Sequence, residues 1–436
     1  MLNKPFITYK SQTITYSEFD ILVNNIEKQF NYFSEIDDFI LLLEDNPIKF
    51  YTTLFALWKN NKKVLFPNNG SFKGNMASFA KFILQSENIK KNRDYMKLDI
   101  PNESDTVLFS SGSTGEPKGI LHKRENFFDN AQSVYNELKI DNITSVTILK
   151  PYLVSALSHV LVHRLGKSHI IFLDIDDIKD ISDLSSKYDE LSYVGSPMHL
   201  ISILPFIKNK NPKLFFSSGD IFYPSVIKDI VKKYKNTIFY NVWGMAELGG
   251  RMFINKVTDD NLDTISSIGN NIFQTEIKIV DDEVCVKSDF LFDGYIINNK
   301  FIQRKDEFFK TGDKIIKVNN YYEFFGRTND EIKVAGNKVS LKYIEKQISL
   351  ILTDTITPIV VSQQHELLGN LIVLVLYSKN SIQYTRQELI LELRDVLESF
   401  EIPHKIYITN TVPYTQTMKI DRKKIVDLLD NLELLR

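Results

Sequence analysis

A short run of small, hydroxyl-bearing and basic residues could bind a polyphosphate. Residues 106–119 read TVLFSSGSTGEPKG, in which an apolar strand leads into a loop that ends near Lys118. Small residues allow backbone N–H groups to turn inward and form an anion-binding nest, and Lys118 adds positive charge. The candidate contacts are Ser110, Ser111, Gly112, Ser113, Thr114, Gly115 and Lys118.

The spacing of this loop differs from that of a Walker A loop. That motif needs G-x-x-x-x-G-K-[ST] at the start of a helix, whereas Gly112 and Gly115 are too close together and Pro117 interrupts the run. A Ser/Gly-rich stretch taken alone is usually a polar surface loop. The Pro-Lys-Gly ending favours phosphate binding here.

The run SSGSTGEPKG resembles the phosphate-binding signature of the adenylate-forming superfamily. That superfamily includes acyl- and aryl-CoA synthetases, adenylation domains of peptide synthetases and luciferases. Its members join a carboxylate to ATP as an acyl-adenylate and then pass the acyl group to a thiol. Further motifs follow in the family's order along nearly the whole chain. The resemblance therefore implies an AMP-forming acid–thiol ligase that uses ATP and Mg²⁺.

Two central motifs imply the adenine and metal sites. Residues 215–220 contain Gly219 and resemble the segment that lines the acyl and adenine pockets, and residues 241–247, NVWGMAE, resemble the aromatic-Gly-x-Thr-Glu motif. By this resemblance Trp243 stacks on adenine and Glu247 holds Mg²⁺, which prefers hard oxygen ligands. The remaining nucleotide contacts implied here are Asn241, Gly244, Met245 and Ala246.

The later motifs imply the ribose, hinge and catalytic positions. Asp313 in KTGD would accept hydrogen bonds from the ribose hydroxyls, and Arg327 would contact the nucleotide. Lys419 in PYTQTMKIDR matches the lysine that stabilises charge on the phosphoryl oxygens during adenylation. Lys333 matches a lysine used in the thioester half-reaction. Together with Glu247 and Lys118, these two lysines are the candidate catalytic residues.

Three motif positions depart from the family pattern. Ala246, Asn329 and Met418 stand where the family usually has Thr, an Asp or Lys hinge residue, and Gly. They leave open a degenerate relative that binds a nucleotide without catalysis. Retention of the charged positions argues against that alternative. These positions are Lys118, Glu247, Asp313, Arg327 and Lys419.

The sequence leaves the acid and the acceptor open. The acceptor is CoA or the phosphopantetheine of a separate carrier protein, and the substrate is a small carboxylic acid. Within the segment KPYLVSALSHVLVHRLG, the run Ser155-Ala156-Leu157-Ser158 resembles the short aryl-CoA ligases that act in menaquinone synthesis. His159 and His163 lie one helical turn apart without an H-E-x-x-H zinc pattern, so we expect one core or pocket histidine and one surface histidine.

Composition limits the other classes of function. The net charge of -2 predicts no nucleic-acid partner, and the single cysteine, Cys285, excludes an internal disulfide. No apolar run approaches the roughly 18 residues of a transmembrane helix, and the N-terminus lacks a signal-peptide pattern. We therefore expect a cytoplasmic protein.

Strand and helix patterns alternate through the first 250 or so residues, which predicts an α/β fold with parallel strands. Strands are expected at 146–149, 169–173, 192–194 and 214–217. Residues 1–327 would form a large N-terminal adenylation core of layered sheets, with a small β-rich subdomain at about 254–327. Residues 328–436 would form a small mobile C-terminal α+β domain, with helices near 341–352 and 387–400.

Overall fold

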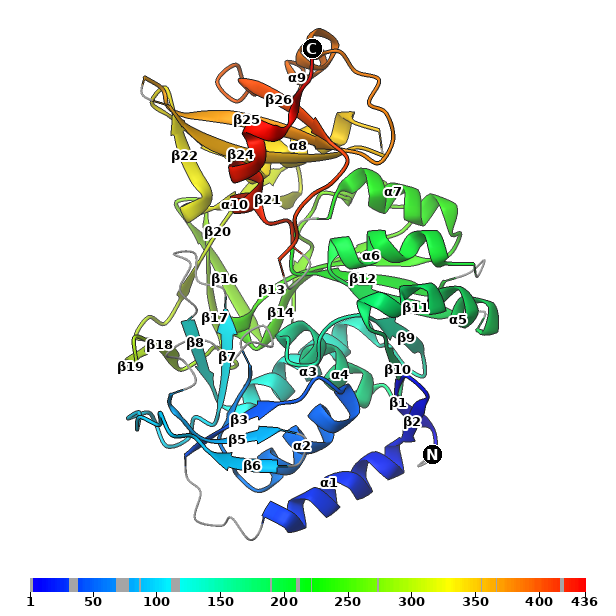
Figure 1. Ribbon diagram of the computed structural model, residues 1–436, viewed down its shortest axis with the longest axis vertical. Helices are drawn as coiled ribbons and strands as arrows, with labels where there is room; N and C mark the ends of the chain where they lie inside the picture. Colours follow the sequence, from blue (N-terminus) through cyan, green and yellow to red (C-terminus); the bar gives the residue numbers. More distant parts are fainter. Residues whose placement is uncertain are drawn as a thin grey trace.

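The computed structural model of the protein is shown in Figure 1. It describes residues 3–30, 38–67, 78–85, 88–110, 118–188, 190–208, 212–220, 222–272, 274–353, 355–365, 367–415 and 419–436, apart from the side chains of Gln29, Phe30, Ser110 and Asn329. The expected α/β architecture is confirmed. Within the described ranges, no helix combines the length and apolar character needed to cross a lipid bilayer.

A nine-stranded sheet forms one layer, in the order β15-β14-β13-β12-β11-β9-β10-β1-β2. Its central strands β13, β12, β11, β9, β10 and β1 are parallel. Such strands are buried on both faces and read as apolar runs, which is why the sequence revealed them. The bounds are β1 (Pro5–Tyr9), β2 (Gln12–Thr15), β9 (Thr144–Thr147), β10 (His169–Phe172), β11 (Leu191–Gly195), β12 (Leu214–Ser218), β13 (Ile238–Met245), β14 (Gly250–Val257) and β15 (Asn270–Asn271).

An eight-stranded sheet forms a second layer, in the order β19-β18-β8-β7-β4-β3-β5-β6. Its strands β7 and β8 pair antiparallel on either side of residues 111–117, so the chain around the phosphate-loop motif forms a hairpin. The bounds are β3 (Phe39–Leu43), β4 (Val64–Leu65), β5 (Ala80–Gln85), β6 (Asn88–Lys91), β7 (Thr106–Ser110), β8 (Lys118–His122), β18 (Gly294–Ile297) and β19 (Lys300–Gln303).

The largest hydrophobic core joins the two sheets through the helices between them. It contains side chains from the β1, β3 and β7 strands and from helices α2, α3 and α4. A second core lies on the other face of the nine-stranded sheet, under α5, α6 and α7. The helices are α1 (Tyr16–Phe30), α2 (Pro47–Lys59), α3 (Arg124–Leu138), α4 (Val154–Leu165), α5 (Ile181–Lys187), α6 (Pro197–Ile203) and α7 (Pro224–Lys233).

The β-rich stretch expected at 254–327 is distributed over three sheets. Strands β14 and β15 extend the nine-stranded sheet, and β18 and β19 extend the eight-stranded one. The remaining strands form a separate four-stranded sheet in the order β16-β17-β20-β21. Their bounds are β16 (Thr275–Val280), β17 (Glu283–Ser288), β20 (Phe309–Val318) and β21 (Tyr321–Arg327).

The C-terminal part has its own sheet and cores, at the top of Figure 1. The order of that sheet is β24-β25-β26-β27, beside a β22-β23 hairpin. Helix α9 ends at Leu393 instead of extending to residue 400. Beyond it the N–H groups of Asp395 and Val396 bond to carbonyls three residues back, the tighter pattern common at helix ends. The bounds are β22 (Glu331–Val334), β23 (Asn337–Ser340), α8 (Leu341–Ile351), β24 (Thr357–His365), β25 (Gly369–Tyr377), α9 (Arg386–Leu393), β26 (Lys405–Thr409), α10 (Arg422–Leu428) and β27 (Glu433–Leu434).

Candidate active site

A cavity of about 890 Å³ lies where the two large sheets, the four-stranded sheet and the C-terminal part meet. It includes residues just beyond the carboxyl ends of the parallel strands β11 and β12, which is the usual place for a ligand in an α/β sheet. Many of the residues expected from sequence line it. They are Lys118, Gly219, Gly244, Met245, Ala246, Glu247, Arg327 and Lys419.

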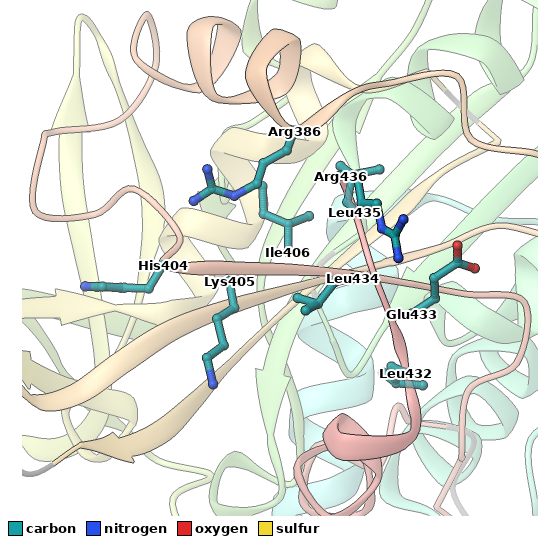
Figure 2. Close-up of a pocket in the computed structure, with 9 residues that line it drawn as sticks. All are labelled: Arg386, His404, Lys405, Ile406, Leu432, Glu433, Leu434, Leu435 and Arg436. Carbon is teal, nitrogen blue, oxygen red and sulfur yellow. The ribbon is translucent and has the colours of Figure 1, made fainter.

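A second hollow, of about 530 Å³, lies on the C-terminal part alone (Figure 2). Arg386, His404 and Lys405 are among the residues around it, together with the end of the chain. None of the residues expected from sequence lines this hollow, so we assign the chemistry to the larger cavity.

Glu247 lies on a short 3₁₀ turn between β13 and β14 and faces the cavity. Its carboxylate accepts a hydrogen bond of 2.9 Å from the Tyr295 hydroxyl on β18. The Lys118 ammonium lies over the Tyr295 ring, 5.6 Å from its centroid. One tyrosine therefore contacts both the expected metal ligand and the expected phosphate-binding lysine.

Glu247 alone does not make a complete metal site. Among the residues the structure describes, no three His, Cys, Asp or Glu side chains cluster as metal ligands would. Mg²⁺ usually binds through one or two carboxylates, with substrate phosphates and water filling the other positions. The Glu247 carboxylate on this cavity wall fits an ion that arrives with a nucleotide.

Asp313 and Arg327 face each other on the antiparallel strands β20 and β21. The Arg327 Nε donates a 2.6 Å hydrogen bond to Asp313 Oδ1, whereas the buried Oδ2 has no partner in the described part of the chain. Burial raises the pKa of Asp313 to about 6, against the opposing charge of Arg327. The carboxylate is thus ionised at neutral pH and has one oxygen without a partner in the described part of the chain. Asp313 itself is 1% exposed and does not line the cavity, whereas its neighbours Thr311 and Gly312 do.

Lys419 reaches the cavity from the C-terminal part of the chain. Its backbone is held by Thr415, through a 2.8 Å bond from Thr415 N to Lys419 O and a 3.2 Å bond from Lys419 N to Thr415 Oγ1. The side chain is accessible from the cavity, but the surrounding protein lowers the pKa of its ammonium, and Asp220 partly offsets this effect.

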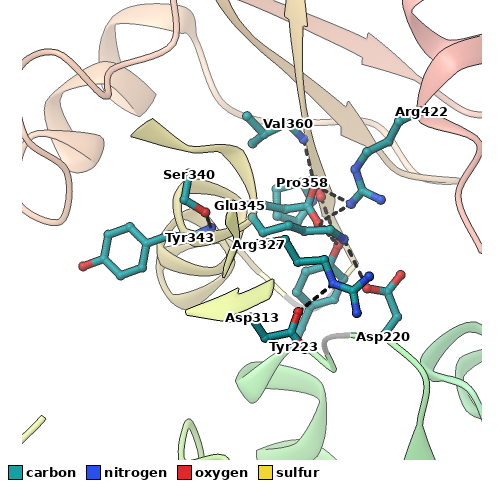
Figure 3. A network of polar contacts seen from close by, with 11 residues as sticks. Asp220, Tyr223, Asp313, Arg327, Ser340, Tyr343, Glu345, Pro358, Val360 and Arg422 are labelled. Atoms are coloured by element: carbon teal, nitrogen blue, oxygen red, sulfur yellow. Dashed lines mark hydrogen bonds and ion pairs between the residues drawn. The ribbon is translucent and has the colours of Figure 1, made fainter. Parts of the chain in front are cut away.

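A buried network around Glu345 joins the C-terminal part to the rest of the molecule (Figure 3). Arg422 Nη2 donates to both oxygens of Glu345, at 2.6 and 2.9 Å, and Val360 N donates to Oε2 at 2.9 Å. From the N-terminal part, the Tyr223 hydroxyl donates to Pro358 O at 3.1 Å, and Asp220 pairs with Lys342 at 3.2 Å.

Burial alone would raise the pKa of Glu345. The charges of Arg422 and Lys342 and the hydrogen bonds outweigh burial and hold the pKa below its usual range. Glu345 is therefore ionised, and Arg422 follows Lys419 closely in the chain. The network fixes the segment that presents Lys419 to the cavity.

Several expected residues do not line the cavity. Trp243 packs its ring on Phe253, at 5.4 Å between centroids, while its neighbours Val242 and Gly244 line the cavity. Asn241, two residues before Trp243, is also absent from the lining, because alternate residues of a strand point to opposite faces. Lys333 is exposed on β22, away from the cavity.

The phosphate loop itself lies largely outside the described residues. This applies to Ser111, Gly112, Ser113, Thr114 and Gly115, and to Met418 beside Lys419. The structure does describe the strand ends on both sides of the loop: Phe109 and Lys118 line the cavity, next to Ser110 at the end of β7.

The expectation of one surface histidine on α4 was wrong. His159 and His163 are each 1% exposed, and their ring centroids are 3.8 Å apart. Residues one turn apart share a helix face, and this face packs on the nine-stranded sheet, where the Ser145 hydroxyl lies 3.0 Å from His159 Nε2.

Sequence reasoning also missed two cationic residues of the cavity wall, Lys310 and Arg251. Lys310 stands directly before the Thr-Gly-Asp motif, so its position was a usable signal. Arg251 follows the Glu247 motif without any pattern of its own, and its interest depends on burial, which only the fold reveals.

Comparison with known proteins identifies the family of the chain. The model of the family described as AMP-binding enzyme matches residues 74–296, about half of the chain, and the chain belongs to that family. It is thus an adenylate-forming ligase by family.

Two curated relatives come from Staphylococcus haemolyticus (strain JCSC1435). A D-alanine--D-alanyl carrier protein ligase is 23% identical over 354 residues, and a putative long chain fatty acid-CoA ligase, VraA, is 24% identical over 333 residues. Each alignment covers 74% of this chain and 70% of the relative.

Solved structures share the fold. The o-succinylbenzoate CoA synthetase MenE from Bacillus subtilis, in complex with the acyl-adenylate OSB-AMP, has a TM-score of 0.77 at 18% identity. ATP-bound MatB from Rhodopseudomonas palustris has a TM-score of 0.78 at 16% identity. Both alignments cover 97% of this chain and 95% of the other. The same MenE has also been solved with ATP and a magnesium ion.

Replacing Glu345 by Gln should loosen the segment that carries Lys419. Removing one partner of a buried ion pair leaves the other charge uncompensated, at a cost of about 3 kcal/mol. We expect a lower urea midpoint and faster hydrogen exchange in α10. The matched control is Glu276→Gln, in an exposed pair with Lys287 3.7 Å away, which should change neither. Unchanged exchange in α10 of the Glu345 variant would contradict the role of the network.

Nucleoside binding should depend on the ionisation of Asp313. Protonation below its pKa of about 6 removes an acceptor, so adenosine affinity should fall about tenfold between pH 7 and pH 5. Adenosine is the probe because it carries no phosphate that titrates in this range, and calorimetry gives the affinity. The Asp313→Asn variant should bind weakly and without this pH dependence; a flat wild-type profile would remove Asp313 from the ribose site.

Proposed function

We propose that this protein activates a small carboxylic acid with ATP and Mg²⁺ and then transfers the acyl group to the thiol of CoA, in the cytoplasm. The observation that carries the proposal is that charged residues from distant parts of the chain line the same cavity. Lys118, Glu247, Arg327 and Lys419 come from four separate stretches of chain and line one cavity, beside an ionised carboxylate with an unused oxygen.

The first step requires positioning and charge stabilisation. A carboxylate oxygen of the acid attacks the α-phosphorus of ATP, the bond to the bridging oxygen breaks, and pyrophosphate leaves. No general base is needed, because carboxylic acids are ionised at neutral pH. Lys419 and Lys118 would stabilise the negative charge that builds on the phosphoryl oxygens. Asp313 would hold the ribose, and Arg327 would contact both the ribose and the phosphate oxygens.

The metal would join the site with the nucleotide. Glu247 would supply a protein ligand, and the bound Mg²⁺ would neutralise charge on the phosphate oxygens. Tyr295 orients the Glu247 carboxylate through its hydroxyl, and Trp243 would need a different side-chain position to stack on adenine.

The second step is proposed to use a rotation of the C-terminal domain. In this scheme residues 1–327 form the core, and residues 328–436 turn at a hinge near Asn329. Lys419 leaves the cavity and the face carrying Lys333 approaches it. The thiol then attacks the acyl carbonyl and displaces AMP. The exposed position of Lys333 in this structure is compatible with a role reserved for the second state.

A second acceptor has specific support. One relative is named as a carrier protein ligase, so transfer to the phosphopantetheine of a separate carrier protein is the alternative. Pyrophosphate release from ATP, measured across aryl, short acyl, long acyl and amino acids with and without CoA, distinguishes the two. A rate that rises with CoA supports the ligase. Release that responds to hydroxylamine but not to CoA supports the carrier protein. No release with any acid, despite ATP binding, would contradict the proposed function.

Lys419→Ala should lower the rate of adenylate formation by about a hundredfold or more while ATP still binds, because it removes a charge needed in the transition state. The measurement is pyrophosphate release beside ATP affinity. Lys423→Ala, on exposed helix α10 nearby, is the control and should keep wild-type activity. Wild-type pyrophosphate release from the Lys419 variant would refute the assigned role.

Lys333→Ala should spare adenylate formation and slow thioester formation. The two half-reactions are measured separately, as pyrophosphate release with hydroxylamine and as CoA consumption from preformed adenylate. Lys338 pairs with Lys333 across the β22–β23 hairpin and is also exposed, so Lys338→Ala is the matched control. An equal loss in both half-reactions would be incompatible with the rotation scheme.

A further inference from the structure

Arg251 is a buried cation on the wall of the cavity. The residue is 4% exposed, lies at the start of β14 and belongs to the cavity lining. Its backbone is fixed by Asn130, which accepts from Arg251 N at 3.2 Å and donates to Arg251 O at 2.7 Å. The side chain therefore starts from a rigid point.

The guanidinium has no anionic partner among the residues that the structure describes. Across the described ranges, burial alone shifts the pKa of Arg251 and no carboxylate opposes it, and the buried Nη1 atom has no hydrogen-bond partner. One face of the group rests on the Phe216 ring, 4.0 Å from its centroid. A cation–π contact offsets part of the cost of burial but satisfies none of the N–H donors.

The surroundings do not supply a charge either. Burial lowers the pKa of both His159 and His163, and the nearby Arg251 charge lowers both further, so the two rings are neutral at pH 7. Burial lowers the pKa of Arg251 only to about 9, which leaves the guanidinium charged at neutral pH. A buried unpaired charge is costly, and proteins normally pair it or bind something to it.

The side-chain contacts of Arg251 differ from those of the charged groups assigned to ATP, although its backbone pairs with Gly244 of the nucleotide motif. Lys118 and Glu247 meet around Tyr295, and Asp313 meets Arg327 on the four-stranded sheet. Arg251 instead lies among side chains of β12 and α4. The cavity wall contributed by the segment before and at the start of α4 is mostly apolar, with Leu149, Tyr152, Leu153 and Val154. Arg251 and Lys419 belong to the same lining as this apolar wall, so an acid with an apolar middle could lie along it with one end toward each residue.

We propose that the acid activated by this protein carries a second carboxylate, which pairs with the guanidinium of Arg251. The inference rests on the proposed function, because it assigns the free end of the acid whose other end is adenylated. A guanidinium binds a carboxylate through two parallel N–H···O bonds, so the second carboxylate satisfies the donors that the protein leaves unused. A methyl group in the same place leaves them unpaired, so Arg251 selects diacids over monoacids.

Matched pairs of acids test this assignment. In each pair one carboxylate is replaced by a methyl group: glutarate against pentanoate, adipate against hexanoate, and phthalate against 2-methylbenzoate. The readout is kcat/KM for pyrophosphate release in the presence of hydroxylamine, which removes any dependence on the acceptor. The wild-type protein should prefer at least one diacid over its partner by about a hundredfold or more.

Arg251→Met keeps the apolar stem and removes the charge. This variant should abolish the preference for the diacid, chiefly through a higher KM for the diacid. The kcat/KM for the monoacid should stay unchanged. Arg251→Lys keeps the charge but lacks the planar guanidinium, so its preference for the diacid should lie between those of the wild type and of Arg251→Met. This variant also covers the case in which the Met variant does not fold. Arg386→Met, on an exposed helix of the C-terminal part, is the control and should retain the wild-type preference.

The outcomes separate this inference from the proposed function. Efficient use of monoacids with no diacid preference would overturn the role of Arg251 while the ligase assignment stands. If no acid releases pyrophosphate, the ligase assignment fails, and calorimetry with glutarate and phthalate in the presence of AMP decides the inference. Binding to the wild type that is lost in Arg251→Met supports it, and the absence of binding to the wild type overturns it.

Discussion

The C-terminal part of the chain reaches the cavity because a buried carboxylate holds two parts of the chain together. Glu345 gathers Arg422, Lys342 and the backbone of β24, while Tyr223 and Asp220 approach from the N-terminal part. An ionised group in such a place is stable only when its partners are all present, since each missing one leaves a desolvated charge. The position of Lys419 thus depends on an interaction that has no part in the chemistry.

The direction of the strands in the sheets is a second constraint on where the site can form. Parallel strands end at the same edge, so the loops after β11 and β12 open into one crevice, and the β7–β8 hairpin faces it from the other layer. The four-stranded sheet then adds the Asp313–Arg327 pair through direct cross-strand register. Groups that are distant in sequence meet because each lies at the end of a strand or within one, and packing fixes the positions of the strands.

The sequence predicted the architecture well, and it pointed to charged residues that the fold brings to one cavity. Parallel strands are revealed by unbroken apolar runs, and motif order identified Glu247, Asp313, Arg327 and Lys419 without geometry. The features that the sequence did not reveal depended on which face of a strand or helix a side chain occupies. Trp243 lies on the strand face away from the cavity lining, His163 is buried by the sheet beneath α4, and Arg251 became interesting only once its burial without a counter-ion was visible. A motif states which residue is present; only packing determines which face it occupies.

The shared tyrosine on β18 has a consequence for binding order. Strand β18 pairs with β8 directly after the phosphate-loop motif, and Tyr295 on it touches Glu247 by hydrogen bond and Lys118 through its ring. A ligand that immobilises the Glu247 carboxylate therefore also restricts Tyr295, whose ring lies against Lys118. The conformational entropy lost in the first event is not lost again in the second. Metal and polyphosphate should consequently bind with positive cooperativity, each raising the affinity for the other even if the backbone does not move.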